Sequence, residues 1–276
     1  MFGVALGIKP DHFLQLRRDP KAVFTGLFCQ YFLLPVLTVV LIYMLDPAPD
    51  IALGMILIAS CPGGNASNFF SMLAKGNLAL SVTLSAFTSI FCFLLTPLSF
   101  FFLSSLVPSL VVRVQSLDIS FTDLFVNMVI ILLIPLVAGM SFARFFPNAT
   151  EKIYKILRTL SMLLLMGIIG VAFTKNFDVF RSHIMSVFWI VILHNGLGLA
   201  AAYFFSSALK NSESVNRSVA IETGIQNSGL GLILIFTFFQ GNGHMALVAA
   251  WWGIWHLISG FGFSLLVRTR TFPQPL

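Results

Sequence analysis

The chain has 276 residues, of which 58% are hydrophobic and only 9% are charged, and its mean hydropathy is +0.94. Soluble domains carry about 25% charged residues, so this composition excludes an ordinary soluble protein. Apolar runs of about 20 residues recur from end to end, which predicts an all-α, polytopic membrane protein. The net charge of +6 does not indicate nucleic-acid binding, because the basic residues lie in short segments between these runs.

The apolar runs predict eight full spans, after an apolar tail at residues 2–8 that is too short to cross a membrane. The spans cover residues 22–44, 51–74, 78–106, 121–146, 153–174, 184–209, 215–239 and 245–267. A longer polar connection, extending through Asp118, separates the third span from the fourth. We interpret residues 1–20 as the tail of a truncated helix followed by a cytoplasmic loop.

The distribution of Lys and Arg tests this threading. If residues 11–21 lie in the cytoplasm, thirteen basic residues fall on the cytoplasmic side and three on the far side, as the positive-inside rule requires. The cytoplasmic set is Lys9, Arg17, Arg18, Lys21, Lys75, Arg144, Lys152, Lys155, Arg158, Lys210, Arg217, Arg268 and Arg270; the far set is Arg113, Lys175 and Arg181. The pattern predicts an integral, multi-pass membrane protein, and we expect its location to be a bacterial inner membrane.

One acidic residue lies deep in an apolar run. Of the ten acidic residues, nine fall in loops or at the ends of spans, and only Glu222 is at bilayer depth. A charge at the membrane centre costs about 3 kcal/mol on insertion scales, so a partner must neutralise or coordinate it. We predict that Glu222 is a cation ligand. Paired-carboxylate catalysis has no candidates, and no nucleophile–base pair or catalytic metal motif indicates an enzyme.

Two spans are interrupted by polar and helix-breaking residues. The first interruption is CPGGNASN at residues 61–68, and the second is ETGIQNSG at residues 222–229. Pro62 and the pair Gly63-Gly64 should open the helix, and the freed carbonyls then need partners within the membrane. Oxygen ligands of this kind suit a hard cation, and we predict sodium. The alternative is that Gly and Pro belong to ordinary membrane helices and that the hydroxyls only join helices.

The two halves of the chain repeat the same pattern. Each half has a span with a mid-membrane amide (Gln30, Asn195), then an interrupted span, then a turn with glycine (residues 75–77 and 241–243). With residues 11–21 in the cytoplasm and the spans alternating in direction, the two halves have opposite orientations in the membrane. Interrupted spans at matching positions of inverted repeats indicate the binding site of a secondary transporter.

The motifs together resemble the sodium/bile acid symporter family over essentially the whole chain. They are CPGGNASN, Gly76-Asn77-x-x-Leu80-Ser81, His194-Asn195-Gly196, ETGIQNSG and Trp255-His256-x-Ile258-Ser259-Gly260. The resemblance implies a ten-helix fold of two inverted repeats, with a core domain (residues 21–106 and 183–268) moving against a panel domain (residues 119–174). It also implies that the first helix and most of the second are absent from this chain.

The resemblance implies two sodium sites and a substrate cavity. The first site would use Ser67, Asn68, Ser81, Ser85 and Glu222. The second would use Gln30, Glu222, Thr223, Ile225 and Gln226, with backbone carbonyls at Thr223 and Ile225. Asn65, Asn195, Asn227 and His256 would face the substrate. Asn65 and Leu257 differ from the residues usual at these positions in the family. Both differences bear on the identity of the substrate and not on the ion sites.

The sequence therefore predicts a sodium-coupled symporter of an organic anion, either bile-acid-like or a small carboxylate. It predicts no cofactor beyond the coupling ions, and the lipid bilayer, sodium and the anion as partners; it carries no signal for oligomeric state. The alternatives are a sodium-independent uniporter or efflux carrier on the same fold, for which Cys61 could serve a thiophilic substrate, and a transport-incompetent short form.

Overall fold

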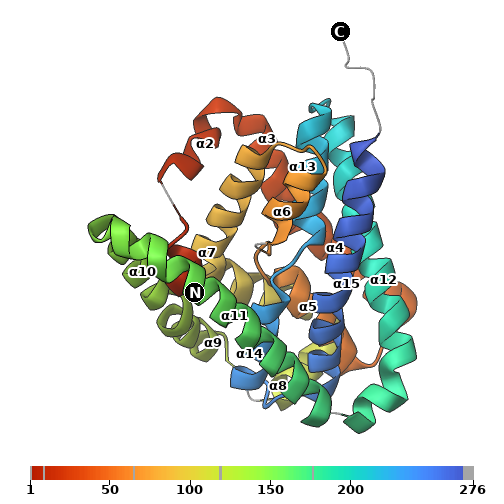
Figure 1. The fold of residues 1–276 in the computed structure, drawn as a ribbon. Coiled ribbons are helices and arrows are strands. Elements are labelled where there is room, and N and C mark those ends of the chain that lie inside the picture. Colours follow the sequence, from red (N-terminus) through yellow and green to blue (C-terminus); the bar gives the residue numbers. More distant parts are fainter. Residues whose placement is uncertain (1, 9, 65, 118–119, 176, 270–276) are drawn as a thin grey trace.

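The computed structural model describes residues 2–8, 10–64, 66–117, 120–175 and 177–269, and within these ranges the chain forms helices and no named strand (Figure 1). The first half comprises α1 (Phe2–Ala5), η1 (Pro10–Phe13), α2 (Gln15–Arg18), α3 (Pro20–Phe28), η2 (Cys29–Leu33), α4 (Leu34–Leu45), α5 (Pro49–Ser60), α6 (Ala66–Leu73), α7 (Leu78–Ser105) and α8 (Pro108–Ser116). The second half comprises α9 (Phe121–Met128), η3 (Val129–Leu133), α10 (Ile134–Phe145), α11 (Pro147–Lys175), α12 (Phe177–Ala208), α13 (Glu213–Gly224), α14 (Ser228–Phe238) and α15 (Gly243–Arg268).

Several of these helices can cross a membrane. Among the described residues, five helical stretches are long and apolar enough, namely Pro20–Leu45, Leu78–Ser105, Phe121–Phe145, Arg181–Ala208 and Gly243–Arg268. The helices α5 and α14 are apolar but too short to cross alone. The other predicted spans, and the arrangement of the spans as an inverted repeat, therefore remain predictions.

Two of the crossing helices contain a π-helical turn directly before a proline. The segment η2 (Cys29–Leu33) precedes Pro35, and η3 (Val129–Leu133) precedes Pro135. Proline has no N–H and its ring crowds the preceding turn, and a π turn absorbs this without ending the helix. The first of these turns carries Gln30, so the local widening positions a residue of the predicted ion site.

The polar connection predicted after the third span contains a helix, α8, which was not predicted from the sequence. Helix α8 begins with Pro108, a residue favoured at the first helical position, and buries Leu110 and Val114 on one face. Its Arg113 binds both oxygens of Asp50 at 2.6 and 2.9 Å. Burial alone would raise the pKa of the Asp50 carboxyl, but hydrogen bonds from Arg113 and Asn242 hold it below its ordinary value.

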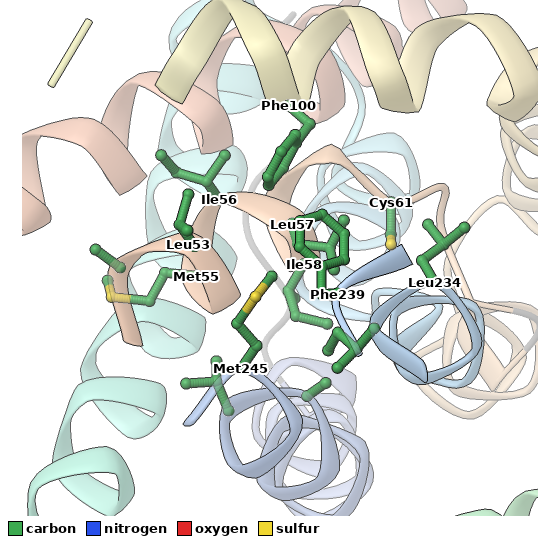
Figure 2. Close-up of a cluster of buried hydrophobic side chains, with 14 of the residues drawn as sticks. Leu53, Met55, Ile56, Leu57, Ile58, Cys61, Phe100, Leu234, Phe239 and Met245 are labelled. Carbon is green, nitrogen blue, oxygen red and sulfur yellow. The ribbon is translucent and has the colours of Figure 1, made fainter. Parts of the chain in front are cut away.

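The main apolar core surrounds α5, whose side chains from Ile51 to Ser60 are all buried. Figure 2 shows α5 contributing Leu53, Met55, Ile56, Leu57 and Ile58, which lie among side chains from α7, α14 and α15 and near Phe239 just after α14. A helix that is apolar on every side is stable only when it is covered on every side. The core thus holds α5 and α14 in place although neither is long enough to cross the bilayer.

Candidate functional site

Both predicted interruptions are present, and they lie against each other near the middle of the bundle (Figure 1). The first separates α5 from α6, and the second separates α13 from α14. The Gly64 amide donates to the Ile225 carbonyl at 2.6 Å, and the Asn227 amide donates to the Pro62 carbonyl at 2.9 Å. The two opened segments therefore satisfy part of each other's backbone polarity where the chain has left the helix.

The glycine pair allows this close approach. A Cβ atom at Gly64 would meet the Gln226 carbonyl oxygen at 2.9 Å, and one at Gly63 would meet Glu222 Oε2 at 2.8 Å. Both distances are shorter than a carbon–oxygen contact tolerates. Glycine is thus required here for space, in addition to its tendency to end a helix.

Glu222 lies at the end of α13 and is buried, with 3% of its surface exposed. Three serine hydroxyls donate to its carboxylate: Ser67 on α6 and Ser81 on α7 at 2.5 Å each, and Ser85 on α7 at 3.0 Å. The salt bridges among the described residues are Asp50–Arg113 and Glu213–Arg217, so none of them neutralises Glu222.

Asn68 completes this cluster from α6. Its Oδ1 lies 3.0 Å from Ser81 Oγ, whose single proton can serve either this oxygen or Glu222, and 3.5 Å from Ser85 Oγ. The structure therefore gathers all five residues predicted for the first sodium site, from three helices that are separate in sequence. A carboxylate, an amide oxygen and three hydroxyls are oxygen donors of the kind that hard cations take.

The residues predicted for the second site also lie together. Gln30 and Gln226 form a reciprocal amide pair, with N···O distances of 2.9 and 3.0 Å. Gln30 Nε2 also donates to the Cys61 carbonyl at 3.0 Å, and Gln226 Nε2 donates to the Thr223 carbonyl at 2.7 Å. The Ile225 carbonyl, a predicted sodium ligand, accepts the hydrogen bond from the Gly64 amide that joins the two interruptions. The Thr223 hydroxyl, in contrast, bonds the preceding helical turn at Val219.

The four residues predicted for the substrate have different surroundings. Asn65 lies outside the described residues. Asn195 is buried and uses both amide atoms inside the protein, donating to the Gly224 carbonyl at 2.7 Å and accepting from Ser259 Oγ at 2.6 Å. Asn227 accepts from the Leu230 amide at 3.0 Å and so caps α14. His256 is buried, and its Nδ1 has no hydrogen-bond partner among the residues that the structure describes.

Two contacts of the site carry no signal in the sequence. The pairing of Gln30 with Gln226 joins residues 196 positions apart, and Ser259 reaches Asn195 across 64 positions. The family resemblance placed Gln30 and Gln226 in one site, but nothing in the sequence indicated that their amides would bond each other or that Ser259 would bond Asn195. Cys61 is fully buried and lies in the apolar core of Figure 2, so its thiol is covered by apolar side chains.

The fold and the site together define a class of protein. Helices interrupted at membrane depth, with opened backbone and a carboxylate converging at the crossing, are the arrangement in which secondary transporters bind ions and substrates. The five long apolar helices make the chain an integral, multi-pass membrane protein.

Comparison with known proteins identifies the particular family. The profile of the sodium bile acid symporter family matches residues 1–183. The uncharacterized sodium-dependent transporter YocS of Bacillus subtilis (strain 168) is 32% identical over 260 residues, which cover 94% of this chain and 78% of that protein. The probable chloroplastic sodium/metabolite cotransporters BASS2 of Oryza sativa subsp. japonica and BASS1 of Arabidopsis thaliana are each 28% identical.

The chain belongs to the sodium bile acid symporter family. The plant proteins align with 99% and 100% of this chain, which spans 63% and 66% of their own length. These relatives are transporters and not enzymes, which confirms the prediction that the chain is not an enzyme.

Proposed function

We propose that the protein is a sodium-coupled symporter of an organic anion. The observation that carries this proposal is Glu222, a buried carboxylate that receives three hydroxyl groups at the crossing of two interrupted helices. The family and the names of its relatives support sodium coupling. The substrate class, bile-acid-like or small carboxylate, is our inference from the family and the charge balance.

The first sodium ion would bind among Ser67, Asn68, Ser81, Ser85 and Glu222. Hydroxyl groups suit this role because each has one rotatable proton and two lone pairs. The same serine oxygen can donate to the carboxylate in one arrangement and coordinate a cation in another. The second ion would bind at Gln30, Glu222, Thr223, Ile225 and Gln226, where the amide oxygens and two main-chain carbonyls would be the ligands.

The charge of the site favours an anionic substrate. Glu222 gives the site a charge of −1, two sodium ions would change it to +1, and a monoanion would restore neutrality. A neutral loaded carrier moves through a low-dielectric membrane more easily than a charged one, because the electrostatic cost rises as the dielectric constant falls. Two sodium ions with one monoanion is therefore the stoichiometry we propose.

The transport cycle would move the core domain against the panel domain, so that the site faces each side of the membrane in turn. The panel in this chain would be residues 119–174. Asn65, Asn195, Asn227 and His256 are the residues we propose for contact with the substrate. Of these, His256 is supported by its buried Nδ1, which has no hydrogen-bond partner in the described part of the chain.

Uptake by purified protein in proteoliposomes tests the proposal. A panel of bile acids and small carboxylates would be assayed with sodium outside, and with choline in its place. We expect uptake of at least one anion to depend on sodium, and we expect Glu222→Gln to abolish that dependence because the carboxylate charge is lost. Uptake that is unaffected by choline would favour the sodium-independent carrier, and unchanged sodium stimulation in Glu222→Gln would reject our assignment of the site.

A further inference from the structure

A second polar cluster joins α6 and α13, two of the three helices that carry the first ion site, at the ends remote from that site. Arg217 on α13 is only 7% exposed, and its Nε donates to Glu213 Oε1 at 2.9 Å. Its Nη1 donates to the Ala74 carbonyl at 3.0 Å, directly after the end of α6. Tyr203 Oη on α12 lies 2.9 Å from both oxygens of Glu213 and so orients that carboxylate.

The turn after α6 makes further bonds to α13. The Asn77 amide donates to the Ser214 carbonyl at 2.9 Å, and Ser218 Oγ donates to the Asn77 carbonyl at 3.0 Å. Gly76 lies so close that a Cβ atom there would meet Ser218 Oγ at 2.5 Å. We call the set of Glu213, Arg217, Ser218 and residues 74–77 the Arg217 clamp.

The clamp and the ion site hold the same two helices at opposite ends. Ser67 lies near the beginning of α6, and Ala74 follows its last residue, so the two points are about 10 Å apart along the axis at the usual rise per residue. At the ion-site end Ser67 donates to Glu222, and at the other end Arg217 donates to Ala74. A shift of α6 along α13 by one residue, about 1.5 Å, would break both contacts.

The side chains of the clamp are also suited to holding α6 and α13 in one relative position. The final carbonyls of a helix have no partner within it, and a cationic side chain there satisfies them and opposes the negative end of the helix dipole. Arginine presents a planar array of donors, so Arg217 can donate to the Ala74 carbonyl and to Glu213 at the same time. The single ammonium group of lysine would do this less well.

We propose that Arg217 is a positioning residue for sodium: through the clamp it fixes α6 on α13 and thereby sets the position of Ser67 and Asn68 relative to Glu222. This inference rests on the proposed function, but Arg217 and Glu213 belong to neither proposed ligand set. Residues that orient metal ligands from outside typically change metal affinity by about 10- to 100-fold when they are mutated.

The test measures sodium affinity directly. Binding of radioactive sodium to the purified full chain, with competition by unlabelled sodium at constant ionic strength, gives a dissociation constant, and the unfolding temperature in choline buffer reports stability separately. We expect Arg217→Ala to raise the dissociation constant by about tenfold or more. Arg217→Lys should raise it less, because one donor to the Ala74 carbonyl can be kept.

Arg113→Ala is the control, because it breaks the arginine–carboxylate pair between α8 and α5, and neither Arg113 nor Asp50 belongs to a proposed ion site. It should lower the unfolding temperature and leave sodium affinity unchanged. An unchanged dissociation constant in Arg217→Ala, or an equal increase in Arg113→Ala, would overturn the proposal.

Arg217→Ala could fail to fold, since it leaves Glu213 without its cation. In that case Ser218→Ala tests the positioning role of the clamp, because it removes only one neutral hydrogen bond of the clamp. A smaller increase of the dissociation constant supports the proposal, and the wild-type value overturns it. Absence of sodium binding in the wild-type protein would instead reject the proposed function, so the two failures are distinguishable.

Discussion

At Glu222, three hydroxyl donors take the place of the water that a carboxylate loses on burial. Hydrogen bonds to charged groups contribute about 1.5–3 kcal/mol each, so three of them offset a large part of the cost of burial. The lone deep carboxylate and the two interruptions are visible in the sequence without a structure, and the family resemblance supplied the remaining residues expected here, including Ser81 and Ser85. It could not predict which hydroxyl bonds which oxygen, because that depends on how α6, α7 and α13 pack.

The amide pair of Gln30 and Gln226 gives a prediction for stability. Replacement of either residue by leucine leaves the other amide partly unsatisfied in a buried site, and should lower the free energy of unfolding by about 1–3 kcal/mol. The double replacement removes both amides, so neither amide is left without the other, although the Cys61 and Thr223 carbonyls each lose a donor. We therefore expect the double variant to lose clearly less stability than the sum of the single variants.

Chemical unfolding of the three variants and the wild type in detergent provides the comparison. Contacting residues in one hydrogen-bond network usually show interaction energies of about 0.5–3 kcal/mol in such a cycle. Additive losses would show that the two amides do not depend on each other. Thr38→Val is a useful reference, because the Thr38 hydroxyl bonds His194 and the Leu34 carbonyl and has no contact with the pair.

Among the helices, the interruptions could be predicted and their crossing could not. Proline and paired glycines at residues 62–64 identify a weak point in a helix from local chemistry alone. That Gly64 should bond Ile225 depends on tertiary packing, which has no local signal. The helix α8 was missed for a related reason: residues 108–116 are too polar for a span, and the two-residue apolar face that buries Leu110 and Val114 is too small to be recognised in advance.

The crossing gives a prediction at the level of helices. Gly64→Ala should push the two interruptions apart, because the new methyl group would lie 2.9 Å from a main-chain oxygen. We expect the free energy of unfolding to fall by about 1–3 kcal/mol, as in other overpacked sites, and sodium-dependent uptake to be lost. Thermal unfolding and proteoliposome uptake measure the two effects.

Gly196→Ala is the matched control for this change. It lies within α12, and a Cβ atom there would meet nothing within 4 Å. Alanine is about 1 kcal/mol better than glycine inside a helix, so this variant should be neutral or slightly more stable. Equal behaviour of the two variants would contradict the steric role we assign to Gly64.

For the molecule as a whole, the threading through the membrane can be tested chemically. Cys29, Cys61 and Cys92 are at most 1% exposed, so they should not react with a membrane-impermeant maleimide in the folded protein. Single cysteines at the exposed positions Lys21 and Ser116 then report the side of the membrane. We expect Lys21→Cys to be labelled only from the cytoplasm and Ser116→Cys only from outside.

Inverted and right-side-out vesicles supply the two sides for this experiment. Labelling of both positions from the same side would mean that the number of crossings between residues 21 and 116 is even, in conflict with the predicted threading. Labelling of the two positions from opposite sides would also support the prediction that α5 and α6 together cross the membrane once. The length of either helix alone does not establish this crossing.

The crossing between α5–α6 and α13–α14 is held by main-chain atoms: the amides of Gly64 and Asn227 bond the carbonyls of Ile225 and Pro62. Every amino acid except proline supplies the same amide and carbonyl, so these two bonds do not depend on which side chains project from the junction, provided that residues 63 and 64 stay glycine. Replacements at those side chains can therefore alter ion and cargo preference while the junction stays assembled. A library randomised around the crossing, with Gly63 and Gly64 kept, should yield folded carriers of altered selectivity.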